Sequence, residues 1–353
     1  MKSISIGKHE VDSGRTFIIA EAGVNHNGDL SLAKALVDAT AASGADAVKF
    51  QTFVTEDVIT KSAPKAAYQT RNTRGSESQF EMIKHLELSR EAHFELAAYA
   101  SQRGVTFLSS PFDERSVDLL GEIGVPAFKI ASGEIVNWPL LQKAARFGRP
   151  MIVSCGMSTI GEVEEAIQVI NDAGNQQVVL LHCTSNYPTS SADVHLRVMD
   201  TLRQAFSLPV GYSDHTIGIS VPVAAVARGA AVIEKHFTLD KSLPGPDHVV
   251  SLEPNELATM VRMIREVETS LGDQTKRVLR AEEEIRTVAR KSIVAARELV
   301  PGMVLDRHSV AFKRPGTGIY PKALETILGR TVLEHIYPDQ LIRWDQLGGK
   351  AKG

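Results

Sequence analysis

The chain has 353 residues, of which 43% are hydrophobic and 23% are charged, and its formal net charge is −3. These values are typical of a folded globular protein and exclude a disordered, strongly charged chain. They provide no basic field for nucleic acid, so we expect no nucleic-acid partner. The length is sufficient for one large domain and a small one.

The N-terminal segment MKSISIGKHEVDSGRT lacks the continuous apolar core of a signal peptide, and no run of about 18 apolar residues follows it. Cys155 and Cys183 each lie inside an apolar run, where a free cysteine behaves as a small buried hydrophobe. Their number and spacing indicate neither a disulfide framework nor a metal site. We therefore expect a cytoplasmic protein without membrane contact.

Eight short apolar runs of strand length follow one another, at 17–23, 47–52, 105–110, 127–132, 151–156, 178–183, 209–214 and 232–238. Segments with helical apolar periodicity lie between them, and several end in the glycine expected just past a helix. This repeat predicts an α/β fold, a (β/α)8 TIM barrel. A doubly wound sheet is the competing architecture, but GVNHNG after the first run does not match its Gly-rich phosphate loop.

One long insertion, at 53–89, separates the second predicted strand from its helix. Long loops at this face of a barrel are usually functional, so we expect a lid or substrate loop. After a last barrel helix at about 254–271, the chain becomes charge-dense and then rich in turns. We predict a catalytic barrel at 1–275, a linker at 276–291 and a small second domain at 292–353.

Polar side chains gather at the C-terminal ends of the predicted strands, which is the catalytic face of a barrel. They are Glu21, Lys49, Gln51, Ser110, Lys129, Ser132, Glu134, Ser154, Ser213, His215 and His236. Taken singly, a strand-end serine is often a helix cap, and a lone histidine is often a hydrogen-bonded structural residue. Their convergence favours a binding site.

His215 and His236 end the seventh and eighth strands, which are neighbours in a closed barrel. Imidazole is a common ligand of divalent transition metals, and a site with few carboxylates keeps positions open for a carbonyl oxygen. We therefore expect the two histidines to hold a metal.

Lys49 and Lys129 are the other unusual residues, because an unpaired lysine inside a barrel is costly. With the neighbouring serines they would form a cradle for a phosphate and a carboxylate. A salt bridge to Glu21 or Glu134 is the structural alternative. A lysine acting as a Schiff-base nucleophile is the chemical alternative.

Motifs along almost the whole chain resemble those of the sialic acid synthases and their legionaminate and pseudaminate relatives. They are EAGVNHNG, AVKFQT, KAAYQTRNT, SSPFDE, FKIASGE, SCGMST, HCTSNYPT, GYSDHT, EKHFTLDKSLPGPDH and KRPGTGI. The resemblance implies a TIM barrel followed by a type III antifreeze-like (SAF) domain. It also implies a domain-swapped homodimer in which that domain reaches over the partner's barrel.

The resemblance further implies site residues. It places Mn²⁺ or Mg²⁺ on His215 and His236. It assigns phosphoenolpyruvate to Lys49, Ser110, Lys129, Ser132, Ser154, Ser185 and Ser213. It assigns an N-acetylated amino sugar to Glu21, Gln51, Asn72, Glu134, Tyr187, Asp247 and Arg314, the last coming from the other subunit. Glu134, Glu21, Lys49 and Lys129 are the expected catalytic residues.

Three positions depart from the family pattern. Ser110 stands where some members have Thr, and Ser185 stands where some have Asn, which shortens its reach. Thr317 replaces the Asn of the common KRPGNG motif. The 53–89 loop also lacks the Tyr- and Trp-rich pattern of pseudaminate synthases, which argues against that branch.

The reaction that the resemblance implies is an aldol-type condensation of phosphoenolpyruvate with N-acetylmannosamine, with C–O cleavage and phosphate release. An N,N'-diacetyllegionaminate synthase, using 2,4-diacetamido-2,4,6-trideoxymannose, is the alternative within the family. A Schiff-base lyase of keto-acid sugars and a carbohydrate- or ice-binding protein are more distant alternatives. The polar barrel mouth argues against a pure binding protein, and the identity of the sugar remains open at this point.

Overall fold

The computed structural model describes residues 4–66, 69–70 and 78–351. The chain divides into two compact units, Met1–Gly272 and Asp273–Gly353, which are described separately. Within the described residues, no helix combines the length and the apolar composition needed to cross a bilayer.

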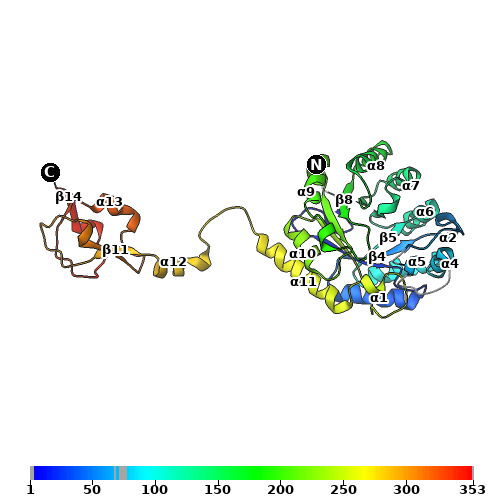
Figure 1. Ribbon diagram of the computed structural model, residues 1–353, viewed down its shortest axis with the longest axis horizontal. Coiled ribbons are helices and arrows are strands. Elements are labelled where there is room, and N and C mark those ends of the chain that lie inside the picture. The colour runs from blue at the N-terminus through cyan, green and yellow to red at the C-terminus, as the bar shows by residue number, and fades with distance from the viewer. Residues whose placement is uncertain (1–3, 67–68, 71–77, 352–353) are drawn as a thin grey trace. The chain divides into compact units, whose positions relative to one another are not determined.

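Unit 1 is built on one eight-stranded parallel sheet with the order β5-β4-β3-β10-β9-β8-β7-β6 (Figure 1). Its strands are β3 (Phe17–Gly23), β4 (Ala47–Thr52), β5 (Thr106–Pro111), β6 (Phe128–Ile130), β7 (Met151–Ser154), β8 (Val178–Cys183), β9 (Val210–Asp214) and β10 (Val232–His236). The last strand, β10, pairs with the first, β3, and β5 lies beside β6 at the two ends of the order. The predicted TIM barrel is therefore confirmed, strand by strand.

A helix follows each strand and covers the outside of the sheet, as Figure 1 shows. These helices are α1 (Leu30–Ser43), α5 (Arg90–Gln102), α6 (Glu114–Ile123), α7 (Trp138–Ala145), α8 (Ile160–Asp172), α9 (Val198–Phe206), α10 (Ser220–Ala227) and α11 (Pro254–Leu271). The first is typical: Asp29 caps it by accepting from the backbone N–H of Ser31, and Gly44 ends it in a left-handed conformation.

The inside of the barrel is apolar at one end and polar at the other. Along β3, the inward positions read Phe17, Ile19 and then Glu21, because side chains alternate between the two faces of a strand. Phe17 and Ile19 belong to an inner apolar cluster, which an N-terminal hairpin, β1 (Ser5–Ile6) and β2 (His9–Glu10), extends with Ile6. The apolar end therefore anchors the strands, and the polar end is free to carry chemistry.

The 53–89 connection contains α2 (Thr55–Val58) and α4 (Gln79–His85) within its described part. A capping box begins α4: Ser78 accepts from the N–H of Glu81, and the Glu81 carboxylate accepts from the N–H of Ser78. Ile83 on this helix packs against a small apolar cluster of Val24, Phe53 and Leu86. The connection is thus partly helical and is attached to the catalytic end of the barrel.

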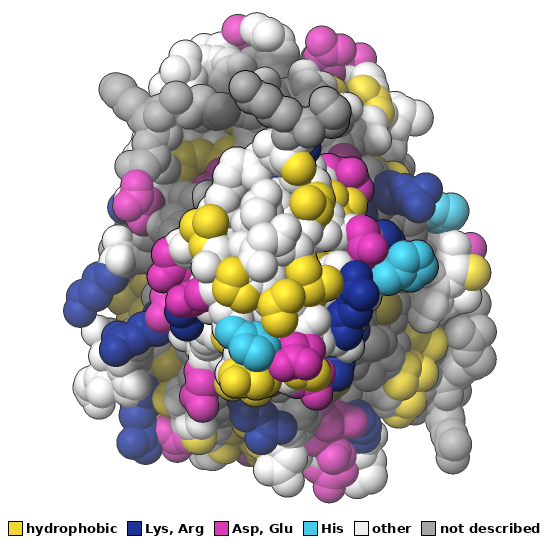
Figure 2. Space-filling model, turned by 90° about the vertical axis from the view of Figure 1, so that its left-hand side faces the viewer, with side chains coloured by type: hydrophobic (Ala, Val, Ile, Leu, Met, Phe, Trp, Pro, Cys, Tyr) yellow, Lys and Arg dark blue, Asp and Glu magenta, His cyan; other side chains and the backbone are white. Residues whose placement is uncertain are grey.

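Unit 2 has two small antiparallel sheets around its own apolar core. It contains α12 (Glu283–Ala289), β11 (Ser292–Ala295), β12 (Val310–Lys313), α13 (Leu324–Ile327), β13 (Arg330–Val332) and β14 (Leu347–Lys350). Ile293, Leu305, Ile336 and Ile342 are among the core residues. Figure 2 shows one face of the molecule, on which hydrophobic side chains are mixed with charged ones and histidine.

Candidate active site

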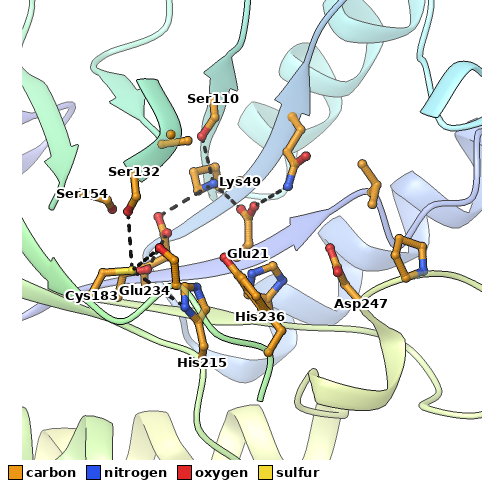
Figure 3. Close-up of a pocket in the computed structure, with 18 of the residues that line it drawn as sticks. Glu21, Lys49, Ser110, Ser132, Ser154, Cys183, His215, Glu234, His236 and Asp247 are labelled. Atoms are coloured by element: carbon orange, nitrogen blue, oxygen red, sulfur yellow. Dashed lines mark hydrogen bonds and ion pairs between the residues drawn. The ribbon is translucent and has the colours of Figure 1, made fainter. Parts of the chain in front are cut away.

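A cavity of about 460 Å³ lies at the C-terminal ends of the strands, and every strand of the barrel contributes to it. The predicted residues that line it are Glu21, Lys49, Gln51, Ser110, Lys129, Ser132, Ser154, Ser185, Tyr187, Ser213, His215, His236 and Asp247. Figure 3 shows Ser132, Ser154 and Cys183 on one side of the cavity and Asp247 on the other, with Lys49 and Glu21 between them. Residues far apart in the sequence therefore form one site.

Three predicted residues are not placed in this cavity. Glu134 is half-buried but is not a lining residue, and its carboxylate accepts a hydrogen bond of 2.7 Å from Asn137. Burial raises the pKa of Glu134. Arg314 belongs to unit 2, so its position relative to the cavity is not defined. Asn72 lies outside the described residues.

The two lysines each contact a serine at the base of the cavity. Lys49 Nζ donates to Ser110 Oγ at 3.1 Å, and Lys129 Nζ donates to Ser154 Oγ at 2.8 Å. Two ammonium groups flanked by hydroxyls suit a small polyanion.

Gly156 allows two further hydroxyls to join this cradle. A Cβ atom at this position would lie 2.3 Å from Ser185 Oγ and 2.8 Å from Ser132 Oγ. The backbone N–H of Gly156 also donates to Ser132 Oγ at 3.0 Å. Only glycine lets these side chains approach the strand end so closely.

Two buried carboxylates balance the lysines. Glu21 lies 2.6 Å from Lys49 Nζ, and Glu234 lies 3.8 Å from Lys49 Nζ and 3.4 Å from Lys129 Nζ. Burial raises the pKa of Glu21, against the opposing effect of Lys49. Burial also acts to raise the pKa of Glu234, but Lys129 and Lys49 outweigh it and hold that pKa below its ordinary value.

Glu234 is the main residue of the site that was not predicted from the sequence. It interrupts the apolar run of β10 and lies two positions before His236, so the strand alternation puts both on the inner face. That alternation is the signal that identifies it. Cys183, which was predicted only to be buried, also lines the cavity, with its Sγ 3.8 Å from His215 Nδ1.

The two histidines lie together, with ring centroids 5.4 Å apart. His215 Nδ1 donates to the carbonyl oxygen of Thr184 at 2.8 Å, which leaves its Nε2 as the lone-pair nitrogen. His236 Nδ1 is buried and has no hydrogen-bond partner among the described residues. Burial holds the pKa of His236 well below its ordinary value, which favours the neutral ring that binds metals. Burial also acts to lower the pKa of His215, but Cys183 and the hydrogen bond to Thr184 outweigh it and raise that pKa.

The histidine pair fits a divalent cation with open coordination positions. Nowhere in residues 4–66, 69–70 and 78–351 is a group of three or more His, Cys, Asp or Glu placed to hold a metal ion. His215 and His236 could provide two nitrogens to a cation whose other positions are filled by substrate and water.

The outer wall of the cavity is apolar on one side. Val24, Ile83 and Phe112 line it there, and they come from the β3–α1 turn, α4 and the segment after β5. Asp247 lies in the same cavity, and burial raises its pKa to about 6. Its Oδ1 has no hydrogen-bond partner among the described residues.

Comparisons with known proteins identify the family of the chain. Residues 36–276 match the NeuB family, and residues 290–348 match the SAF domain. The N,N'-diacetyllegionaminic acid synthase of Campylobacter jejuni is 48% identical over 331 residues, 93% of this chain and 99% of the relative. The enzyme of the same name from Legionella pneumophila is 49% identical over 94% of each chain.

A solved structure is also similar to this chain over most of its length. The crystal structure of N-acetylneuraminic acid synthetase from Leptospira borgpetersenii, in complex with citrate, is 35% identical in sequence and has a TM-score of 0.71. It covers 80% of this chain and 95% of its own.

Proposed function

The chain belongs to the NeuB family, as its motifs predicted, and we propose that it condenses phosphoenolpyruvate with 2,4-diacetamido-2,4,6-trideoxymannose to form N,N'-diacetyllegionaminate. The observation that carries this proposal is the division of the cavity into a cationic, hydroxyl-rich end and an end with an apolar wall. The first end suits the phosphate and carboxylate of phosphoenolpyruvate. The second suits the methyl groups of a deoxygenated, acetylated sugar.

The apolar wall favours this sugar over N-acetylmannosamine. The diacetamido sugar has a methyl group at C6 and an acetamido group at C4, whereas N-acetylmannosamine has a hydroxymethyl and a hydroxyl there. A hydroxyl against Val24, Ile83 or Phe112 would lose its hydrogen bonds to water. Among the described residues that line the cavity, Lys49 and Lys129 are the cationic ones, and both lie at the end proposed for phosphoenolpyruvate.

The proposed mechanism uses both ends of the cavity. C3 of phosphoenolpyruvate forms a bond to C1 of the open-chain sugar aldehyde, water adds at C2, and phosphate leaves with cleavage of its C–O bond. Lys49 and Lys129 would bind the phosphate and carboxylate and balance the negative charge that grows on the leaving group. Glu21, next to Lys49 and with a raised pKa, is suited to exchange a proton with the reacting oxygens.

We assign the metal to His215 and His236. Mn²⁺ or Mg²⁺ held there would supply Lewis acidity toward the aldehyde oxygen. Tyr187, whose ring lies 4.1 Å from that of His215, helps to enclose the histidine pair and to exclude water from it.

The alternative of a Schiff-base lyase is less well supported. A Schiff-base lysine must be a neutral amine, and such lysines are usually desolvated without a counter-ion. Here Lys49 lies within ion-pair distance of Glu21, and Lys129 within ion-pair distance of Glu234. Burial lowers the pKa of Lys129, and the Glu234 carboxylate opposes this effect.

Steady-state assays test the proposed sugar. Phosphate release from phosphoenolpyruvate should be measured with the diacetamido sugar, N-acetylmannosamine and N-acetylmannosamine 6-phosphate. We expect kcat/KM to be at least ~10-fold higher for the first, since one apolar contact is worth that much in a hydrophobic pocket. Ile83→Asn should reduce the preference, whereas Val136→Asn, at an exposed position, should not. A preference for N-acetylmannosamine would make the enzyme a sialic acid synthase instead.

A further inference from the structure

An ion pair lies on the helix-facing side of the barrel, behind the two histidines. It joins Asp214 of β9 to Lys235 of β10, and each residue directly precedes a histidine of the site. We propose that this pair is a positioning device that fixes the backbone of His215 and His236 and thereby sets the metal affinity of the site. The inference rests on the metal assignment made above.

The strand register explains why the pair lies behind the histidines. Lys235 and Asp214 are direct partners in the β9–β10 ladder. Because alternate side chains point to opposite faces, these two point toward the helices while the following histidines point into the cavity. Their side chains are 1% and 0% exposed, and Lys235 Nζ lies 2.5 Å from Asp214 Oδ2.

The pair also holds the residue on the far side of His215. Lys235 donates to the carbonyl oxygen of Thr216, and the backbone N–H and the hydroxyl of Thr216 donate to Asp214 at 3.1 and 2.9 Å. Tyr212 completes the network by donating from its hydroxyl to Asp214 at 2.9 Å. The residues before and after His215 are therefore bound to each other and to the residue before His236.

Folding alone gives little reason for this pair. Tyr212 and Ile233, its neighbours on the same face, belong to the apolar layer between strands and helices. A buried ion pair is often no more stabilising than apolar residues of the same volume, because desolvation offsets the attraction. A requirement for fixed backbone geometry explains the charged residues better.

Metal binding would require such a fixed backbone geometry. His215 and His236 are the two protein ligands of the proposed metal site, so affinity would depend strongly on how well their nitrogens are placed. Groups that orient ligands typically change metal affinity ~10- to 100-fold when they are removed. The Asp214–Lys235 pair would act in this way through the backbone rather than through the imidazole ring.

A double variant separates positioning from stability. In Asp214→Asn with Lys235→Met, neither charge is left buried without its partner, so the barrel should fold. We expect the Mn²⁺ dissociation constant, measured from the electron paramagnetic resonance signal of free Mn²⁺, to rise ~10- to 100-fold. At saturating Mn²⁺, kcat should recover toward the wild-type value, because the catalytic residues are unchanged.

The matched control is the ion pair between Asp46 and Arg265, where the nitrogen–oxygen distance is 2.7 Å. Asp46 precedes β4 and so lies at the opposite end of the barrel, and Asp46→Asn with Arg265→Met should leave Mn²⁺ affinity unchanged. If the Asp214→Asn, Lys235→Met protein binds Mn²⁺ as tightly as the wild type, the positioning role is overturned. The positioning role is also overturned if the two double variants lose equal Mn²⁺ affinity. Neither result would contradict the metal assignment. A wild-type protein that binds no Mn²⁺ would overturn the metal assignment and this inference with it.

Discussion

At the scale of single residues, the site is organised around charges that are buried but balanced. Lys49, Lys129, Glu21 and Glu234 are all nearly inaccessible to solvent, and each cation contacts a carboxylate. An incoming phosphoenolpyruvate anion must therefore compete with these carboxylates for the lysines. Glu234 is important here because it is the carboxylate found within 4 Å of Lys129 among the described residues.

Glu234→Gln should reveal this competition. Loss of the carboxylate leaves Lys129 buried without a counter-charge, and we expect the free energy of unfolding to fall by about 3 kcal/mol. Inorganic phosphate should then raise the thermal midpoint more in the variant than in the wild type, because the anion replaces the lost carboxylate. Glu95→Gln, which breaks an exposed contact with Lys34, is the control. Equal stabilisation by phosphate in all three proteins would argue against Glu234 as the partner of Lys129.

Asp247 should produce a distinct pH dependence of stability. Burial raises its pKa from 3.8 to about 6, so between these values the folded state keeps a proton that the unfolded state has lost. The stabilisation is complete below pH ~4 and disappears as the pH rises through ~6, a change of about 3 kcal/mol. Unfolding free energies of the wild type and Asp247→Asn should therefore differ in slope across this range. Parallel curves would show that the carboxyl ionises normally.

The sequence was sufficient to predict which residues lie at the cavity where a polar side chain ends a strand. Ser110, Ser154 and His236 are examples, since the apolar run before each residue fixes its position at the cavity. Glu234 was missed because it lies inside such a run. Val24 and Phe112 were missed because nothing in their local sequence shows which way a loop residue faces.

At the scale of elements, the β3–α1 turn and α4 are in close contact. Gly28 has a φ of 75°, and a Cβ atom there would lie 2.4 Å from the carbonyl oxygen of His85, the last residue of α4. The turn therefore determines how near α4 lies to the cavity. Ile83, on the same helix, lines the cavity wall.

Gly28→Ala should consequently affect the sugar more than phosphoenolpyruvate. The substitution combines backbone strain with a clash that pushes α4 outward, and we expect the KM for the sugar to rise while that for phosphoenolpyruvate changes little. Gly104→Ala is the matched control, because Gly104 has a similar φ of 74° and open space around a Cβ atom. The control should lose about 1 kcal/mol of stability, and Gly28→Ala about 1 to 3 kcal/mol more. If the two variants lose equal amounts of stability, α4 can shift to relieve the clash without an energetic cost.

The strands of the barrel could be predicted because each is a buried, mainly apolar run followed by a helix, and most of these helices have a capping residue. The 53–89 connection could be predicted only as a functional loop. Its helix α4 is short, and its position depends on the packing of Ile83 against a cluster that contains Val24 and Phe53, which are distant in sequence. Such tertiary contacts leave no periodic signal.

At the scale of the whole molecule, the question is what unit 2 contributes to the function of the barrel. Unit 2 has its own apolar core, and its match to the SAF domain confirms the predicted second domain. Arg314 directly follows β12, is exposed, and donates from Nε to the carbonyl oxygen of Ala289 at 3.0 Å. The resemblance predicts that this arginine reaches the sugar site of the other subunit in a homodimer.

A heterodimer of two impaired subunits, assayed at a sugar concentration well below the KM of the Arg314→Ala variant, tests that prediction directly. One subunit carries Arg314→Ala, which should raise the KM for the sugar, and the other carries His236→Ala, which removes a metal ligand. If the arginine acts across the dimer, the barrel with intact histidines receives the intact Arg314 of its partner, and the purified heterodimer should have about half of the wild-type activity.

A heterodimer of His215→Ala with His236→Ala is the control, because neither barrel can then hold the metal, and it should stay inactive. If Arg314 instead acts within its own chain, each barrel of the first heterodimer lacks one essential group. At the same low sugar concentration, that heterodimer would then be no more active than the Arg314→Ala homodimer. Dimer formation, verified by two different affinity tags, would then have no catalytic role through this residue.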